Sequence, residues 1–167
     1  MKKTFINQDL VDLRLQGQLP KIKISDRSFI IDWRLKELRA VDNPGHSISM
    51  KHLPLTPDGE SYYFFLHEPS LRLVSIGENI TRLPKDVVLV EIPNELKLDP
   101  IGVAREFGLQ DTEMLATFPI QRDLTAKVTP LQDTALADLA LKNKEKTGLK
   151  AFIKKLKPKT KGKGFRR

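Results

Sequence analysis

The sequence predicts an α+β fold, in which a small, mostly antiparallel sheet of five or six short strands is followed by short helices. Two observations favour it. Before Pro93, short apolar runs rich in alternating or β-branched residues are separated by turn signals. After Pro93, apolar residues recur at the three- and four-residue spacing of helices. We therefore expect an N-terminal helix in residues 1–18, an α+β body in 19–128, C-terminal helices in 129–156 and a disordered basic tail in 157–167.

The elements before Pro93 are expected in the following order. A helix should run from Asn7, as N-cap, to Gln16, with Leu10, Leu13 and Leu15 on its apolar side. Strands should follow at 21–24, 29–34, 48–53, 61–67, 71–76 and 87–92. Turn-forming residues at 25–28, 42–45 and 56–59 separate several of these segments. Residues 35–41 fit either an extension of the second strand or a turn.

The last of these strands is the most apolar short run in the chain. Five of the six residues from Val87 to Ile92 are apolar and four of them are β-branched. Pro93 should end the strand, because proline cannot donate a hydrogen bond to a neighbour. This pattern predicts a central strand that is covered on both faces, with Val90 in the core.

Helix signals dominate the rest of the chain. Asp99 is a good N-cap, Pro100 fits the first helical position and Gly108 fits the residue after the helix end. Further helices are expected at 111–118 and, with Thr129 as N-cap, from Pro130 to about residue 146. Gly148 should interrupt that helix, and 149–156 should form a last amphipathic helix.

Charge is distributed unevenly along the chain. Residues 142–167 contain twelve Lys or Arg residues and one acid, whereas residues 1–141 carry a net charge of −3. Such a basic arm neutralises phosphates with little sequence preference, and an aromatic side chain within it can stack on bases. The arm therefore predicts contact with nucleic acid or a ribonucleoprotein. The residues expected to make it are Lys154, Lys155, Lys157, Lys159, Lys161, Lys163, Phe165, Arg166 and Arg167. An acidic protein partner, or no specific partner, are the alternatives.

No enzyme motif is recognisable. The chain has no cysteine, which excludes disulfides, thiolate metal sites and cysteine nucleophiles. It also lacks a G-x-S-x-G elbow and a phosphate-binding loop after a strand. We therefore expect a non-enzymatic binding or adaptor module without a cofactor. The alternative is a small metal-dependent enzyme that uses His52, His67 and nearby carboxylates such as Glu68.

The aromatic run at residues 62–65 could form a base-stacking platform, as aromatic strands do in some RNA-binding sheets. No basic residue interleaves the run, so we expect it to pack in the core instead. The chain has no run of eighteen apolar residues, and its first residues lack the pattern of a signal peptide. These observations predict a cytoplasmic protein without membrane association.

Residues 19–24, 29–32, 93–96 and 98–108 are similar to segments of small uncharacterised proteins of Bacteroidetes-type bacteria. The similarity runs from about Leu19 to Gly108. It implies a bacterial, cytoplasmic origin and a mobile-element neighbourhood. It implies no activity, because that family has no assigned catalytic residues to carry over.

Overall fold

The computed structural model describes residues 6–156. These residues fall into two compact units. The first unit comprises residues 6–75 and 85–130, and the second comprises residues 76–84 and 131–156. The predicted tail, residues 157–167, lies outside the described residues.

The first sheet of the first unit is an antiparallel meander, in which every strand pairs with the next along the chain. Its strands are β1 (Lys21–Ile24), β2 (Arg27–Asp32), β3 (Glu37–Ala40) and β4 (Ser47–Ser49). Strict alternation in β1 exposes its two lysines and buries its two isoleucines. One face of this sheet therefore belongs to the core.

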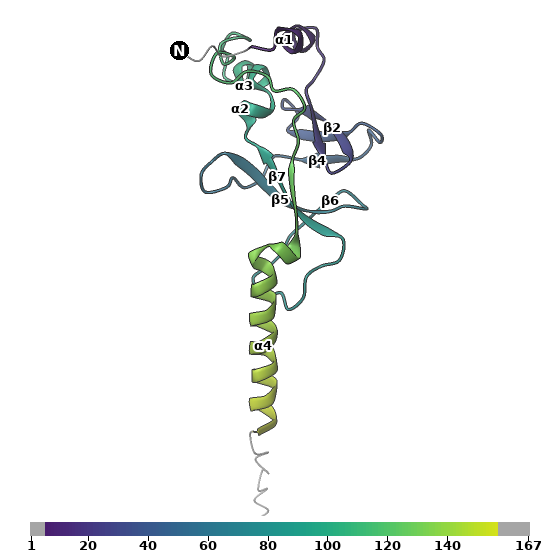
Figure 1. Ribbon diagram of the computed structural model, residues 1–167, viewed down its shortest axis with the longest axis vertical. Coiled ribbons are helices and arrows are strands. Elements are labelled where there is room, and N and C mark those ends of the chain that lie inside the picture. The colour runs from purple at the N-terminus through teal and green to yellow at the C-terminus, as the bar shows by residue number, and fades with distance from the viewer. Residues whose placement is uncertain (1–5, 157–167) are drawn as a thin grey trace, which may run out of the picture. The chain divides into compact units, whose positions relative to one another are not determined.

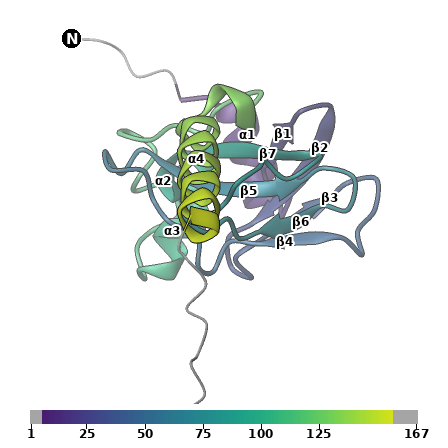
Figure 2. The same cartoon turned by 90° about the horizontal axis from the view of Figure 1, so that it is seen from below.

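The second sheet is also antiparallel and has the strand order β6-β5-β7-β8. Its strands are β5 (Ser61–His67), β6 (Arg72–Val74), β7 (Val87–Pro93) and β8 (Lys127–Pro130). Figure 2 shows β5 between β6 and β7. The apolar strand β7 pairs along its whole length with β5 and also with β8, so it is an inner strand, as its sequence predicts.

Three helices complete the first unit: α1 (Gln8–Leu15), α2 (Glu95–Leu98) and α3 (Pro100–Glu106). Figure 1 shows them gathered at one end of the unit. The Asp99 side chain accepts a hydrogen bond from the Gly102 N–H, with Pro100 at the first helical position, and Gly108 takes a positive φ of 70°. The N-cap, the proline position and the glycine after α3 are thus confirmed.

The core consists of two clusters of buried apolar side chains. The larger cluster joins residues of both sheets, including Phe29, Ile31 and Val90, with residues of α2 and α3. The smaller cluster comprises Val11, Ile101, Leu115 and Ile120. Since α3 contributes to both clusters, it connects the sheets to α1.

The second unit contains a short 3₁₀ helix, η1 (Leu131–Asp133), and the 22-residue helix α4 (Ala135–Leu156). The Asn143 side-chain amide donates hydrogen bonds to the carbonyl oxygens of Glu78 (2.7 Å) and Ile80 (2.9 Å). These bonds hold the 76–84 loop against α4 within this unit.

The α+β class is confirmed, but the strand count is wrong: the described residues form eight strands in two sheets, rather than five or six. The two additional strands are β3 and β8, which carry charged residues or proline and so give a weak apolar signal. β8 lies at a sheet edge. Pro130 has no N–H to donate, but an edge strand tolerates proline because one side of it needs no partner strand. The segments predicted at 48–53 and 71–76 form only the three-residue strands β4 and β6.

The helix predictions after Gly108 need three corrections. Residues 111–118 form successive turns rather than a helix. Pro130 ends β8, so the long helix begins only at Ala135. Gly148 lies inside α4 instead of interrupting it. An internal glycine costs about 1 kcal/mol, which strong helix formers on both sides offset.

The helix at the N-terminus has the predicted position but not the predicted buried side. Val11 and Arg14 are buried, whereas Leu13 and Leu15 are exposed. Asn7 makes no side-chain cap; its amide instead donates to the Ile120 carbonyl at 2.8 Å. Tertiary contacts therefore decide which face of α1 turns inward.

No helix among residues 6–156 is long and apolar enough to cross a membrane.

Asp32 provides a test of how this unit responds to acid. Its buried carboxylate accepts hydrogen bonds from Arg39 Nη1 (2.8 Å) and from the Leu35 N–H (3.1 Å). Burial alone would raise the pKa of Asp32, but these bonds outweigh it and hold the pKa below its usual value. Asp32 therefore stabilises the fold above its unfolded pKa of about 3.9, and this contribution is lost as the pH falls through the folded pKa.

Urea unfolding at pH 6 and at pH 2.5 tests this contribution. Between these two pH values, the wild type should lose more stability than Asp32→Asn does. The exposed control Asp26→Asn should behave as the wild type, and equal acid losses in Asp32→Asn and wild type would contradict the prediction.

Candidate functional site

The first candidate site is a row of lysines on α4, hereafter the lysine row. Lys142, Lys146, Lys150 and Lys154 are spaced four residues apart, so they lie along one side of the helix over about 18 Å. All four are exposed. The row thus presents four positive charges to a partner.

No lysine of α4 forms a salt bridge within residues 6–156. Like charges at i and i+4 destabilise a helix by about 0.2–0.5 kcal/mol per pair, and the row contains three such pairs. An anionic partner would remove this repulsion.

An apolar stripe adjoins the row. Leu149, Phe152, Ile153 and Leu156 follow the i, i+3, i+4, i+7 pattern of one helix face, and each is between 47% and 65% exposed. Within the described part of the chain, this stripe has no covering element.

The predicted nucleic-acid residues are only partly visible. Lys154 and Lys155 lie in the last turn of α4 and are exposed. The remaining predicted residues lie outside the described residues: Lys157, Lys159, Lys161, Lys163, Phe165, Arg166 and Arg167. The continuous row was missed because the expected break at Gly148 separated Lys142 and Lys146 from Lys150 and Lys154. The four-residue spacing of lysines was the available signal.

The histidines are not gathered into a site. His52 is exposed in a turn after β4, and His67 ends β5 with its Nδ1 2.6 Å from Ser70 Oγ. Among residues 6–156, no group of three or more His, Asp or Glu side chains could hold a metal ion. The metal-dependent alternative thus has no constellation among these residues to support it.

The aromatic run on β5 is at least partly covered. Phe64 is buried, and the Tyr62 hydroxyl donates to Glu95 Oε2 at 2.6 Å. Burial, together with this hydrogen bond, raises the pKa of Tyr62. The run packs against neighbouring elements rather than presenting a row of open rings.

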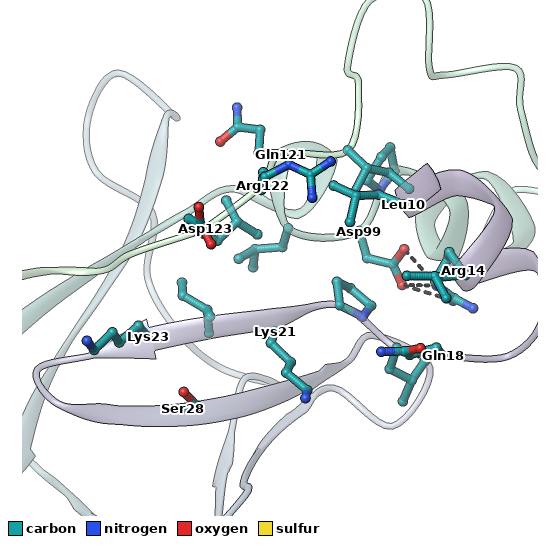
Figure 3. Close-up of a pocket in the computed structure, with 18 of the residues that line it drawn as sticks. Leu10, Arg14, Gln18, Lys21, Lys23, Ser28, Asp99, Gln121, Arg122 and Asp123 are labelled. Atoms are coloured by element: carbon teal, nitrogen blue, oxygen red, sulfur yellow. Dashed lines mark hydrogen bonds and ion pairs between the residues drawn. The ribbon is translucent and has the colours of Figure 1, made fainter. Parts of the chain in front are cut away.

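The second candidate site is a pocket of about 400 Å³ in the first unit, hereafter the β1 pocket (Figure 3). It lies between α1, the start of β1, the α2–α3 junction and residues 120–125. Its apolar walls come from both core clusters, with Leu98 and Leu124 from the larger and Ile120 from the smaller. The pocket is therefore the space left where the two clusters meet.

A buried ion pair lies at one end of this pocket (Figure 3). Arg14 Nε and Nη2 donate to the Asp99 carboxylate at 3.0–3.3 Å, and these residues are only 8% and 1% exposed. Asp99 also caps α3, so one carboxylate connects α1 to the start of α3. A Cβ on Gly102 would collide with the Asp99 carboxylate, so this position favours glycine. The sequence predicted the cap but not this ion pair.

Searches of protein-family models, curated proteins and solved structures find no match to this chain. The resemblance to Bacteroidetes-type proteins therefore stays an expectation from the sequence, and function has to be argued from the two sites themselves.

Proposed function

We propose that this protein is a cytoplasmic, non-enzymatic binding module whose basic C-terminal segment contacts nucleic acid or a ribonucleoprotein. The observation that carries the proposal is the lysine row: four exposed charges at regular spacing, without an ion-pair partner in the described residues. Closely spaced cations that lack internal partners are the electrostatic footprint of phosphate binding. The sequence continues this basic character through Arg167.

The apolar stripe favours a ribonucleoprotein over bare nucleic acid. Phosphate contacts require only the lysines, whereas Phe152 and its neighbours offer an apolar surface that a protein component can cover. A ribonucleoprotein provides phosphates and apolar protein surface side by side. This argument supports the proposal without naming a particular particle.

The experiment neutralises the lysine row. We expect the variant Lys142→Gln/Lys146→Gln/Lys150→Gln/Lys154→Gln to bind fluorescein-labelled RNA and duplex DNA more weakly than wild type in anisotropy titrations. If all four lysines contact phosphates, the slope of log K against log salt should shrink by about 3–4, since each contact contributes about 0.9 on a duplex and 0.7 on a single strand. Glutamine has a helix propensity close to that of lysine, so α4 should persist. Its circular dichroism signal at 222 nm checks this.

A matched control removes the same charge elsewhere. Arg34, Lys51, Arg72 and Lys85 are exposed residues of the first unit, and their replacement by glutamine should leave the salt slope within about one unit of wild type. Equal slopes for the two quadruple variants would contradict the role of the lysine row.

A truncated chain without residues 157–167 measures how much of the nucleic-acid affinity comes from the basic tail. We expect this deletion to abolish most nucleic-acid binding and to leave the stability of the first unit nearly unchanged. Equal affinity of truncated and full-length chains at two salt concentrations would contradict a role for the tail. Equally tight binding of polyglutamate would instead favour an acidic protein partner.

A further inference from the structure

The β1 pocket has the size of a small-molecule site. Its volume of about 400 Å³ falls in the range of about 300–1,000 Å³ that ligand pockets occupy. Nine of its nineteen lining residues are apolar, among them the leucines of α1, Leu19, Ile22 and Leu98. The other ten are polar or charged, and polar groups in a pocket fix a ligand's orientation.

The first of these polar groups is the guanidinium of Arg14. A guanidinium carries five N–H donors, and Asp99 occupies Nε and Nη2. Arg14 Nη1 has no hydrogen-bond partner within residues 6–156, and this atom is not fully buried. Asp99 thus holds a largely buried guanidinium in place beside the pocket and leaves its Nη1 without a partner among these residues.

The second polar group is the backbone of β1 at its outer edge. The Ile31 N–H donates a hydrogen bond to the Pro20 carbonyl. In an antiparallel pair, only every second residue directs its backbone N–H and C=O toward the partner strand. The backbone groups of Lys21 and Lys23 therefore point away from β2, to the opposite edge of β1. Lys23 uses its groups on the Leu124 carbonyl and the Ala126 N–H.

Lys21 has no equivalent partner among the described residues. Asp123 adopts a positive φ of 56° just before Leu124, so the chain that runs beside Lys23 leaves the strand before reaching Lys21. The Lys21 N–H is therefore a free donor at the pocket wall.

The charges around the pocket favour an anion. Its lining contains Arg14, Lys21, Lys23 and Arg122 against Asp99 and Asp123. Arg14 is matched by Asp99, and Arg122 by Asp9 outside the pocket at 2.6 Å. Lys21 and Lys23 form no ion pair within residues 6–156. Asp123 forms no ion pair in that range either, so the unpaired charges of the lining are two lysines and one aspartate, a net charge of +1.

We propose that the β1 pocket binds a small organic carboxylate with an apolar body. The carboxylate meets the donors of Arg14 and Lys21, and the apolar body contacts the leucine and isoleucine walls. Figure 3 shows Arg14 and Gln18 at one end of the pocket and Lys23 and Asp123 at the other, so a linear ligand can extend between them. This site is separate from the lysine row and does not depend on the function proposed above.

Octanoate is a suitable probe, because it combines one carboxylate with a short apolar chain. We expect octanoate, titrated into ¹⁵N-labelled full-length protein, to give saturable NMR shifts at the amides of Lys21, Gln18 and Arg122, with a dissociation constant of about 1 mM. Octanamide, which has the same chain without the charge, should bind at least about fivefold more weakly. The quadruple glutamine variant of α4 should bind octanoate as tightly as wild type does.

Two variants and a control locate the binding. Lys21→Glu should weaken octanoate binding about threefold to tenfold, since an exposed cation at the pocket becomes an anion. Leu13→Trp, at a partly exposed wall position, should abolish the saturable shifts by filling the space. Lys51→Glu makes the same charge change away from the pocket and should bind as wild type does.

The proposal is overturned if octanoate gives no saturable shifts at these amides. It is equally overturned if octanamide binds as tightly as octanoate, or if Lys21→Glu and Lys51→Glu bind octanoate with the same affinity.

Discussion

Replacing Arg14 with methionine should lower the free energy of unfolding by about 3–5 kcal/mol. The Asp99 carboxylate is 1% exposed and receives two of its hydrogen-bond donors from Arg14. Without Arg14, this carboxylate would be a buried charge with only the Gly102 N–H to stabilise it. Methionine fills similar space, so the loss arises from the unmatched charge rather than from a cavity. Urea unfolding followed by circular dichroism measures the change.

The double variant Arg14→Met/Asp99→Asn separates this explanation from a simple loss of packing. Asparagine keeps an N-cap oxygen for α3 but carries no charge. Removal of both charges should therefore recover most of the lost stability, because a buried ion pair gains little over apolar or neutral replacements.

The exposed ion pair between Arg122 and Asp9 provides the matched control. Its side chains are 54% and 59% exposed, so water screens the pair and Arg122→Met should lower the stability far less than Arg14→Met does. A double variant no more stable than Arg14→Met would show that the uncompensated charge is not the cause.

The same residues show how far local sequence signals extend. Asp99 was predicted as a helix cap because capping depends only on the residues that follow it. Its ion pair joins positions 85 residues apart, and no local pattern encodes such a contact. For α1, the leucine spacing favoured one side of the helix, whereas the structure buries Val11 and Arg14. Which face of α1 is buried depends on its contacts with other elements, such as the ion pair of Arg14 with Asp99.

Strand prediction shows the same limit. The β-branched run of β7 was sufficient to predict an inner strand, because few other structures accommodate so apolar a segment. β8 combines lysine and proline, and it becomes a strand only because β7 offers an edge for pairing. In the candidate sites, the abundance of lysine was visible in the sequence, but the lysine row required the continuous α4 helix. The β1 pocket required four elements brought together from distant parts of the chain.

Replacing Val90 with aspartate should destabilise the first unit by several kcal/mol and leave little folded protein at 37 °C. Val90 is fully buried in the inner strand β7, directly opposite Phe64 on β5 and Val128 on β8. The residues opposite position 90 on both neighbouring strands are apolar. The new carboxylate would therefore find no side-chain donor on either strand. A slip of one residue would move the charge out of the core, but it would also expose the buried Ile92 of β7 and bury Glu91 instead. Thermal unfolding compared with Leu73→Asp, on the exposed surface of the edge strand β6, measures the effect, since that control should change stability by less than about 0.5 kcal/mol. An unchanged melting temperature for Val90→Asp would mean that β7 is not the inner strand around which this sheet is built.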